Sequence, residues 1–598
     1  MNAHWTIKSI STNTSQRSKV FAKKFNISPI LSTILANRLN TIQVDSYLNS
    51  NLSNLNNPRL MKGLDQALVI ISQFIKSNEL ICIYGDYDVD GVSSVTILYK
   101  ALKKLGANVM FYIPDREKEG YGLNVKTIKK IQTENSVGLF LTCDNGITNV
   151  QEIEFIKKSG ASVIVIDHHE PLFNEEENQK IEVIPPADAI INPKQSGCKY
   201  PFKVLCAGTI SFKFIEALYN YLGADSNLKK DLWEYLVIAS IATVCDIVDL
   251  VGENRAVTKI GLDIINQNNK INLGLYHLLK VLELTNQFIT EEDYGFKIGP
   301  CINACGRLEH ASLAVKLLTT ESPQEAESLA NQLFNLNLKR KDLTNLAVDT
   351  IVDQLENSNL KDKKVIVIYN QEIHESLAGI VAGKIKESLY KPTFIITKSN
   401  DGVKGSGRSI PSYDMFKEMN KCSHLFTKFG GHQMAAGLSL KEENLQEFSD
   451  LINSNCILQD DDLKEVILID KAINFCDINL NLATELNQMR PFGKDNESPI
   501  FATKSVRLIN LRIVGGNKIL QLDFIDSNGY TQKAISFNGY TNFVKLLSQK
   551  YTDSQVQALL NGEVKEIQHL LDIVYFISVN SFRGVDSVQL NLKDFRFN

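Results

Sequence analysis

The sequence predicts a multidomain α/β protein with a parallel-sheet lobe, a long connecting helix, a second α/β lobe and a C-terminal β-rich domain. Three observations lead to this fold class. Apolar runs alternate with amphipathic segments between residues 60 and 250, which is typical of a parallel sheet covered on both faces. After Pro323, apolar residues keep helical spacing for some thirty residues without Gly or Pro. From residue 465 onward, runs such as Ile519–Phe524 alternate as half-buried strands do.

Composition narrows the class of protein. A chain of 598 residues exceeds what one core organises, so we expect several domains. The net charge of −4 argues against a non-specific nucleic-acid coat protein but leaves room for a local basic groove. The ten cysteines lack a repeated metal-type pairing and fit a reducing cytosol. Because we find neither an apolar signal core nor a run of membrane-spanning length, we expect a cytoplasmic protein, and we expect a monomer.

The N-terminal region looks helical and peripheral, with a typical helix start at Ser28-Pro29 and an Asn-rich connector at 49–57. We expect five parts: an N-terminal helical segment (1–55), a first lobe (56–310), a helical spacer (311–358), a second lobe (359–458) and a C-terminal domain (459–598). The spacer would be one rigid helix about 45–50 Å long. The alternative is a helical hairpin broken near Asn335–Asn337.

The ends of the strands carry the chemistry of the first lobe. Its strand candidates are Leu80–Tyr84, Val109–Ile113, Val137–Thr142, Ser162–Ile166 and Ala189–Ile191. The first, third and fourth of these runs, and a later apolar helix or strand at Val237–Val244, lead into acids or histidines: Asp86, Asp88 and Asp90; Asp144; Asp167, His168 and His169; Asp246. The carboxyl ends of parallel strands meet at one edge of a sheet.

Closely spaced carboxylates repel one another unless a cation lies between them, and a hard divalent cation suits oxygen ligands. For the acidic loop after the first strand alone, a solvated Asp-rich turn is an equal alternative. Four such ends, including two adjacent histidines, favour a shared metal site.

These motifs resemble a known family. Gly85–Gly91, Asp144–Ile147, Asp167–His169 and Asp246 resemble, in order and spacing, the four motifs of the DHH phosphoesterase superfamily. Further blocks are similar to the RecJ family of single-strand-specific DNA exonucleases, namely Pro114–Arg116, Glu119–Gly122, Gly299–Leu308, His374-Glu375, Gly405–Ile410, Phe429–Gly437 and Pro491–Gly493. The resemblance covers the chain from about residue 55 to its C-terminus. It identifies the first lobe as a DHH catalytic domain, the second as a DHH-associated domain and the C-terminal domain as OB-like.

The resemblance implies two divalent cations, Mn²⁺ or Mg²⁺, and a set of catalytic residues. The implied metal ligands are Asp86, Asp88, Asp144, His168 and Asp246. His169 is expected to be a ligand, to support one, or to contact the phosphate. Asp167 is expected to orient the histidines. Asp90 is expected to cap the helix that it begins.

The resemblance also suggests substrate-binding residues. Guanidinium groups suit a terminal phosphate, so we expect Arg116 and Arg408 to bind one, with Ser406 and Ser409 nearby. Arg307 and His374 are expected to hold the scissile phosphate. We further expect backbone amides at Gly430–His432 to approach a phosphate.

In the C-terminal domain, aromatic side chains near lysines are candidates for stacking on bases, although aromatics in strands are more often core residues. The candidates are Tyr530, Phe537 and Tyr540, with Lys518 and Lys533. Two positions depart from the family pattern. Cys301 stands where many relatives have Arg, and Tyr84 stands where some have His.

The function implied is 5′→3′ exonuclease activity on single-stranded DNA, releasing 5′-mononucleotides in DNA repair and recombination. The family's expected partners are a single-strand-binding protein and a RecQ-type helicase. Two alternatives stay open. A phosphodiesterase for short oligonucleotides or cyclic dinucleotides is disfavoured by the extra C-terminal domain, and an inactive replication scaffold is disfavoured because every implied ligand is present.

Overall fold

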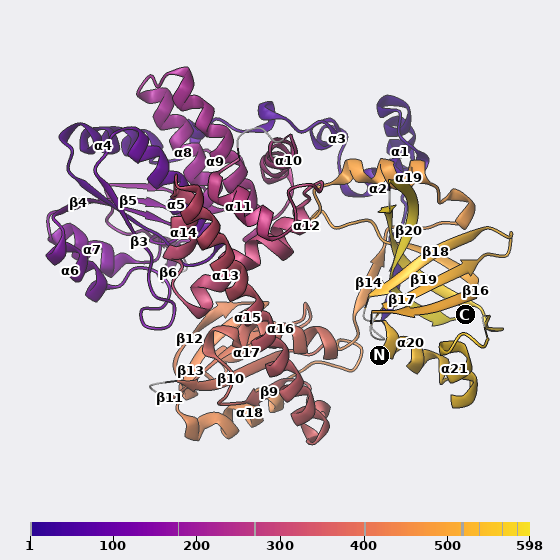
Figure 1. Ribbon diagram of the computed structural model, residues 1–598. Coiled ribbons are helices and arrows are strands. Elements are labelled where there is room, and N and C mark those ends of the chain that lie inside the picture. Colours follow the sequence, from indigo (N-terminus) through magenta and orange to yellow (C-terminus); the bar gives the residue numbers. More distant parts are fainter. Residues whose placement is uncertain are drawn as a thin grey trace. The chain divides into compact units, whose positions relative to one another are not determined.

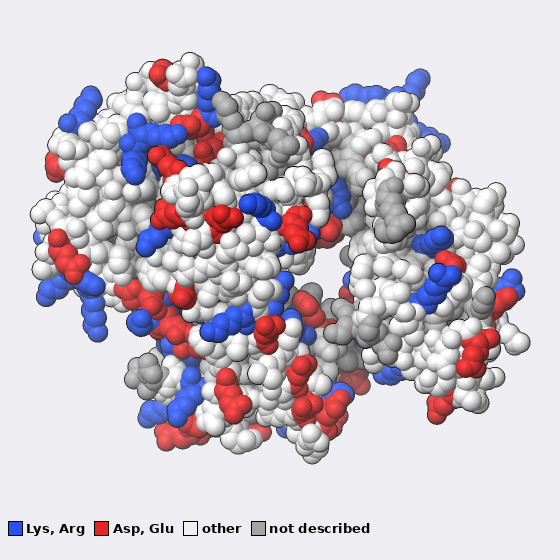
Figure 2. All heavy atoms as spheres, viewed as in Figure 1, with Lys and Arg blue, Asp and Glu red and all other residues white. Residues whose placement is uncertain are grey.

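The computed structural model describes residues 3–176, 179–267, 271–399, 402–515, 519–537, 539–564, 566–582 and 584–598. The chain forms two compact units. One comprises Ser50–Gln459 with Gly493–Asn496, and the other comprises Met1–Asn49, Asp460–Phe492 and Glu497–Asn598. Within the described ranges, no helix combines the length and the apolar character needed to cross a membrane. Acidic and basic side chains are interspersed on the face shown in Figure 2, in keeping with the small net charge.

The first lobe contains the predicted parallel sheet. Its strand order is β3 (Val109–Tyr112), β2 (Leu80–Tyr84), β4 (Val137–Cys143), β5 (Ser162–Ile166) and β8 (Ala189–Ile191), and every pairing is parallel. These bounds agree with the five predicted runs to within one residue. All five carboxyl ends therefore lie at one edge of the sheet.

Both faces of this sheet are covered (Figure 1). Ile83, Leu141 and Ile166 point into a core shared with α4 (Leu64–Ser77), α5 (Val89–Lys104) and α8 (Ala207–Tyr221). Their neighbours Tyr84, Phe140 and Val165 point to the other face, covered by α6 (Val125–Glu134) and α7 (Val150–Lys158). Alternate side chains of a strand point to opposite faces, and here both faces are buried. Both sets of side chains are therefore apolar, and each strand appears in the sequence as a continuous apolar run.

The remaining first-lobe elements are largely helical. Val237–Val244, for which helix and strand were both open, belongs to the helix α9 (Ser226–Cys245), which packs against α5, α8 and α10 (Gly252–Asn266). Asp246 is the C-cap residue of α9. The other elements are β6 (Leu172–Glu176), β7 (Gln179–Val183), α11 (Leu273–Val281), α12 (Glu291–Asp293), the π-helix η3 (Tyr294–Ile298), α13 (Gly299–Leu308) and α14 (Ser312–Thr319).

A single helix of 34 residues, α15 (Pro323–Glu356), connects the two lobes and excludes the hairpin alternative. At 1.5 Å per residue it is about 50 Å long. Its first half contributes Ala326, Ala330 and Leu333 to the core of the first lobe. Its second half contributes Ala347, Ile351 and Leu355 to the core of the second lobe. The helix is thus part of both cores, which fixes the distance between them.

The second lobe is built on a mixed sheet. Its order is β12 (Phe426–His432), β13 (Ala435–Leu440), β11 (Gly402–Arg408), β10 (Thr393–Ser399) and β9 (Ile366–Tyr369), in which only the β9–β10 pairing is parallel among these strands. One face packs on α16 (Ala378–Leu389). On the other face Phe394 contacts Phe448 of α18 (Leu445–Ser454), and α17 (Met415–Asn420) packs against β12 and β13.

The second unit contains a closed barrel, which agrees with the OB-like prediction. Its strands run in the order β16 (Phe501–Val514), β17 (Ile519–Ile525), β18 (Thr531–Phe537), β20 (Val585–Phe597) and β19 (Leu571–Phe582), and β19 pairs back with β16. Further elements of this unit are β15 (Lys471–Ala472), α19 (Leu480–Leu486), α20 (Tyr540–Leu547) and α21 (Asp553–Leu560).

Residues 1 to about 50 are mostly helical, with the predicted helix start at Ser28-Pro29, but the expectation that they are peripheral was wrong. This region forms β1 (His4–Ile7), α1 (Thr12–Phe25), α2 (Pro29–Arg38) and α3 (Gln43–Leu48). β1 pairs in parallel with β14 (Val466–Ile469). Phe21 and Leu31 are fully buried in the same core as Phe501 of the barrel. The N-terminal helices therefore complete the hydrophobic core of the second unit.

The aromatic residues predicted to stack on bases do not form one patch. Tyr530 immediately precedes β18 and Phe537 ends it, so about 23 Å of strand separates them, too far for neighbouring bases. Both rings are exposed, whereas Tyr540 packs partly against the barrel core. Lys533 is exposed on β18, and Lys518 lies outside the described residues.

Candidate metal centre

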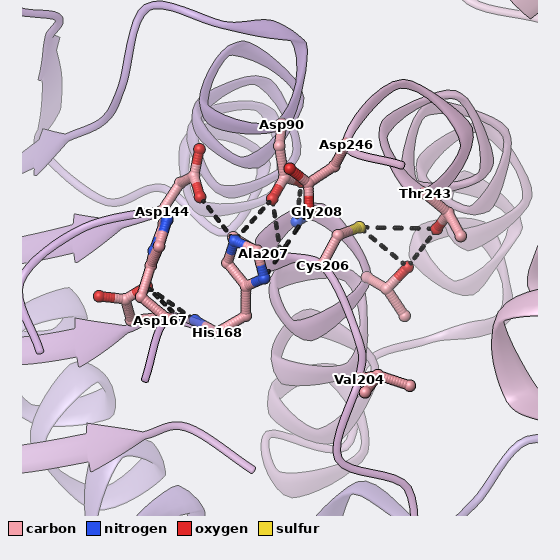
Figure 3. Close-up of polar contacts among 12 residues, drawn as sticks. Asp90, Asp144, Asp167, His168, Val204, Cys206, Ala207, Gly208, Thr243 and Asp246 are labelled. Carbon is pink, nitrogen blue, oxygen red and sulfur yellow. Dashed lines mark hydrogen bonds and ion pairs between the residues drawn. The ribbon is translucent and has the colours of Figure 1, made fainter. Parts of the chain in front are cut away.

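The predicted acids and histidines converge at the carboxyl edge of the first sheet. Figure 3 shows five of them: Asp90, Asp144, Asp167, His168 and Asp246. Their ligand atoms form three groups, each within 4.8 Å: Asp86, Asp88 and Asp144; Asp90, His168 and Asp246; Asp144, Asp167, His168 and His169. The segments that follow three strands supply all of these residues except Asp246, which comes from the end of α9. His168 and Asp144 each belong to two groups, so the three groups form one cluster.

The acidic loop after β2 is shaped by glycines. Asp88 is the N-cap of α5, and its Oδ1 accepts hydrogen bonds from the backbone N–H groups of Asp90 (2.9 Å) and Gly91 (3.0 Å). A Cβ on Gly91 would lie 2.5 Å from the carbonyl oxygen of Asp86, so only glycine fits there. Asp86 is 2% exposed, and its buried Oδ1 has no hydrogen-bond partner among the described residues.

Asp90 does not cap its own helix, contrary to the prediction. Asp88 has that role, and Asp90 caps α8 instead. The Asp90 carboxylate accepts hydrogen bonds from the N–H groups of Ala207 and Gly208, both at 2.7 Å. Burial and the charge of Asp88 raise the pKa of Asp90 to about 6. The physical reason for the difference is that a side chain in the first turn of α5 reaches the positive end of the neighbouring α8.

Asp144 adopts a left-handed backbone conformation, with φ of 61° directly after β4. Such a φ is uncommon for a non-glycine residue and is often found at functional sites. Its N–H donates to the carbonyl of Ile166 at 3.0 Å, which fixes the turn against β5. Burial, followed by the charges of four neighbouring aspartates, raises the pKa of Asp144 well above its ordinary value.

His168 lies at the centre of the cluster. Its Nε2 is 3.2 Å from Asp144 Oδ1 and 3.7 Å from Asp90 Oδ2, and its Nδ1 is 3.7 Å from Asp246 Oδ2. Burial and the charge of His169 lower the pKa of His168 to about 3. The imidazole is therefore neutral at physiological pH, which is the state that a metal ligand requires.

Asp167 orients His169, as expected. Its Oδ1 is 2.7 Å from His169 Nδ1 and accepts from the N–H of His168 at 2.7 Å, while its Oδ2 accepts from the N–H of Ile147 at 2.9 Å. Burial raises the pKa of Asp167, but the hydrogen bond and charge of His169 outweigh it and lower the pKa to about 2. Burial likewise lowers the pKa of His169, and the bond to Asp167 outweighs it, so the pKa of His169 is raised.

Tyr121 belongs to the site, although the sequence analysis singled it out only as part of Glu119–Gly122. Its hydroxyl donates to the backbone carbonyl of Asp144 at 3.0 Å and lies 3.2 Å from the ring nitrogens of His169. Its place in the Glu119–Gly122 motif was the only sequence signal for Tyr121.

The donor set fits divalent cations. Asp86 Oδ1, His168 Nε2 and Asp246 Oδ2 are buried atoms that have no hydrogen-bond partner in the part of the chain that the structure describes. Burial and mutual repulsion raise the pKa of Asp86, Asp144 and Asp246. Unpaired buried acceptors beside repelling carboxylates are costly unless a cation compensates them. Carboxylate oxygens with one imidazole suit Mn²⁺ or Mg²⁺.

The cationic residues lie around this cluster on both lobes. Arg307 of α13 donates from Nη1 to the carbonyl of Ser376 at 2.7 Å, and Ser376 Oγ donates to the carbonyl of Arg307 at 2.9 Å. These two bonds fasten the lobes together. His374 Nδ1 is 2.9 Å from Ser376 Oγ and 3.3 Å from Glu117 Oε1. The guanidinium of Arg116 stacks on the ring of Tyr87, 4.7 Å from its centroid.

Arg408 and Ser406 lie together on β11, where Arg408 Nη1 donates to Ser406 Oγ at 3.1 Å. A Cβ on Gly379 would be 2.8 Å from Arg408 Nη2, so the start of α16 leaves room for the guanidinium. Ser409 is different: it is 1% exposed and donates to the carbonyl of Tyr413 at 2.6 Å. Ser409 does lie next to Arg408, as expected, but its hydroxyl is buried and engaged, so we do not assign it a phosphate contact.

Gly430–His432 form part of the strand β12 rather than a turn. His432 is exposed and pairs with Ala435, which pairs in turn with Arg408. His432 and Arg408 therefore share a face of the sheet, about 10 Å apart.

A groove of about 520 Å³ is lined by Arg116, Arg307 and His374. A second groove of about 870 Å³ shares His374 and continues along α15 to Lys404. The two departures from the family pattern lie outside these grooves. Tyr84 donates to the carbonyl of Gly122 at 3.3 Å, and Cys301 is fully buried.

The fold and the cluster define a DHH-type phosphoesterase architecture, and the comparisons agree. Three family models match: "DHH family, N-terminal domain" over residues 80–240, "DHHA1 domain" over 362–457 and "RecJ OB domain" over 469–594.

Relatives narrow this class further. The chain is similar to the single-stranded-DNA-specific exonuclease RecJ of Haemophilus influenzae, with 30% identity over 92% of this chain and 94% of that protein. The RecJ of Bacillus subtilis is 35% identical over 84% of this chain, but the match spans 62% of that longer relative. The chain therefore belongs to the RecJ family.

Two solved structures are also similar. The RecJ of Thermus thermophilus in complex with Mn²⁺ has a TM-score of 0.80 at 24% identity, covering 99% of this chain and 79% of that chain. A structure of exonuclease RecJ bound to manganese has a TM-score of 0.57 at 29% identity, covering 69% of this chain and 98% of that chain.

Proposed function

We propose that this chain is a metal-dependent exonuclease that hydrolyses phosphodiester bonds of single-stranded DNA from the 5′ end and releases 5′-mononucleotides. The observation that carries the proposal is the buried cluster of carboxylates around a neutral His168, with three unpaired acceptor atoms among the described residues. Membership of the RecJ family, whose relatives are named as single-stranded-DNA-specific exonucleases, supports the substrate.

Five side chains would hold two divalent cations, Mn²⁺ or Mg²⁺: Asp86, Asp88, Asp144, His168 and Asp246. The manganese complexes among the similar structures support this choice of ion. A bound pair of such ions activates the attacking water and neutralises charge on the phosphate during displacement. The protein's own contribution is to hold these ligands at one sheet edge in a buried, weakly screened site.

His169, which lies beside the central His168, would contact the substrate. Asp167 holds His169 in one orientation and favours its protonated form, in which the ring can donate to a phosphate oxygen. Tyr121 supports the same ring. Arg307 and His374 would hold the scissile phosphate, since both border the groove beside the cluster.

Attack at an end requires a group that recognises the terminus. Arg116 and Arg408, with Ser406, would bind a 5′-phosphate, and His432 extends the same polar face of the second lobe. Guanidinium forks suit this bidentate contact. A terminal-phosphate site at Arg116 and Arg408 would make digestion start at the 5′ end and run in the 5′→3′ direction.

We also propose the wider setting that the family resemblance implies. The barrel of residues 459–598 would bind the single strand in addition to the catalytic lobes of residues 56–310 and 359–458. A single-strand-binding protein and a RecQ-type helicase would be partners, the protein would act as a monomer, and its compartment would be the cytoplasm.

Digestion of end-labelled single strands tests the proposal. With Mn²⁺ or Mg²⁺, a 5′-labelled strand should release its label at once as a mononucleotide, while a 3′-labelled strand should shorten progressively. Chelator should stop both reactions. Immediate release of the 3′ label would reverse the direction, and faster hydrolysis of a dinucleotide than of the long strand would favour the short-oligonucleotide phosphodiesterase.

A further inference from the structure

Arg340, on the helix that connects the two lobes, is held in a defined orientation without a carboxylate partner. Its Nε and Nη2 donate to Asn337 Oδ1 at 3.1 and 2.9 Å, one turn earlier on α15. Among the described residues we find no ion pair to this guanidinium. Fixing a long cationic side chain costs conformational entropy, and a free surface arginine would not be expected to show such a fork.

The support of Arg340 is itself built into the core. Asn337 is 2% exposed, and its Nδ2 donates to Cys301 Sγ at 3.4 Å. Cys301 lies on α13, the helix that also carries Arg307. The amide of Asn337 therefore has one end fixed against α13, which leaves its oxygen for Arg340. Arg340 is half-buried beside α13, the helix that carries Arg307. Among the described residues, its guanidinium makes no hydrogen bond other than the two to Asn337.

Arg340 is one of several arginines close to Arg307. Burial lowers the pKa of Arg307, and the charges of Arg116, Arg340 and Arg408 lower it further, in that order. The pKa of Arg408 is lowered by burial and by Arg116. Arg116, Arg340 and Arg408 are therefore all close enough to Arg307 to affect its pKa, and the contact from Asn337 to Cys301 on α13 holds Arg340 beside the helix that carries Arg307.

Like charges near one another are unfavourable unless they bind anions. Arg116 and Arg307 border one groove, and each also interacts with the acidic cluster, since Arg116 lowers the pKa of Asp86 and Asp88 raises that of Arg307. Arg116 and Arg307 therefore adjoin the metal centre. A single strand presents one phosphate per nucleotide. Once its terminal and scissile phosphates are bound, every further backbone phosphate lies on the 3′ side of the scissile bond, and Arg340 is a cationic group available to bind one of them.

We propose that Arg340 binds a backbone phosphate of the single strand on the 3′ side of the scissile bond, supported by Asn337. This inference rests on the proposed function, because it takes the terminal phosphate to lie at Arg116 and Arg408 and the scissile phosphate at Arg307. It adds a contact that a dinucleotide cannot reach and a longer strand can. Arg340 therefore contributes to the preference for long substrates.

Salt titration of binding gives a direct test. Metal-free full-length protein is titrated with a single strand of about twenty nucleotides, and the slope of log Kd against log salt is measured. Arg340→Ala should reduce this slope by about 0.7, the value for one phosphate contact with a single strand. Arg340→Lys should keep the slope, because it keeps the charge. Lys339→Ala, which removes an equal charge from an exposed neighbouring position, should leave the slope unchanged.

Kinetics locate the contact. For Arg340→Ala, KM for the long strand should rise about tenfold, as expected for loss of about 1.4 kcal/mol, with kcat nearly unchanged, and dinucleotide hydrolysis should equal that of the wild type. Asn337→Ser, which keeps the charge but weakens its support, should raise KM less. Thermal unfolding of each variant checks that it is folded. If Arg340→Ala is not folded, the comparison of Arg340→Lys and Asn337→Ser with the wild type provides the test.

The outcomes separate the two proposals. A wild-type slope and KM for Arg340→Ala, in a protein that digests single strands, would overturn the role of Arg340 and leave the nuclease function standing. Equal losses on dinucleotide and long strand would overturn its position along the strand. A wild-type protein that neither binds nor digests a single strand would overturn the proposed function first.

Discussion

Asp144 shows how much chemistry depends on one residue. Its strained backbone turns the carboxylate toward His168, and burial together with four other aspartates raises its pKa. A strained backbone and repelling buried carboxylates are both unfavourable without a cation, so this residue is suited to cation binding. The sequence predicted the place of Asp144 at the end of a strand, because an Asp that directly follows an apolar run marks such an end. Its backbone conformation could not be predicted from the sequence. Its charged neighbours could not be predicted either, because they belong to distant parts of the chain, next to β5, α5 and α9.

The raised pKa values make cation binding depend on pH. Asp86, Asp144 and Asp246 hold protons below their raised pKa values, and a cation must displace those protons. Mn²⁺ affinity should therefore rise with pH, by about tenfold per pH unit for each proton displaced. Calorimetric titration with Mn²⁺ at about pH 6 and about pH 8 measures this change. Equal affinities at both pH values would show that the carboxylates are already ionised without the metal.

Arg408 allows a test of end recognition. Arg408→Ala should weaken the preference for a 5′-phosphate over a 5′-hydroxyl more than it lowers turnover at saturating substrate, because the fork acts on the terminus rather than on the reacting bond. Competition between 5′-phosphorylated and 5′-hydroxyl strands gives the ratio. Ser409→Ala is the matched control, since that hydroxyl is engaged with Tyr413. Identical ratios in wild type and Arg408→Ala would remove Arg408 from the terminal site.

At the scale of elements, the sequence was sufficient to predict a helix or strand wherever the spacing of apolar residues fits only one of the two. All five strands of the first sheet and the connecting helix were predicted, since their apolar spacing fits one structure. Val237–Val244 remained open because a short, mostly apolar run fits a strand or a buried helix. The bond from Asp90 to α8 joins residues 117 positions apart and has no local signature.

The connecting helix should be needed for activity and not for cation binding. Proline at position 346 would remove a backbone hydrogen bond and clash with the preceding turn, at a cost of about 3 kcal/mol. Leu346 is 65% exposed, so Leu346→Ala changes little packing and serves as the control. Leu346→Pro should lose nuclease activity through misplacement of Arg408 and His374, while Mn²⁺ titration stays unchanged. Full activity for Leu346→Pro would show that the lobes are positioned by other contacts.

At the scale of the whole molecule, the sequence did not predict which segments far apart in the chain pack together. Residues 1–49 join the unit of the barrel, where β1 pairs with a strand some 460 residues later. Amphipathic helices at an N-terminus look alike whether they pack on their own lobe or on a remote one. The sequence could show that these helices have an apolar face but not which core receives it.

The proposed nuclease activity depends on a cation site assembled from four separate parts of the first lobe. Its most direct test is the stoichiometry of Mn²⁺ binding to the full-length protein. We predict two Mn²⁺ ions per wild-type chain, fewer in Asp88→Asn, Asp144→Asn and Asp246→Asn, and two in Asp115→Asn, whose carboxylate pairs with Lys118 away from the cluster. Wild-type binding in all three cluster variants would contradict the account.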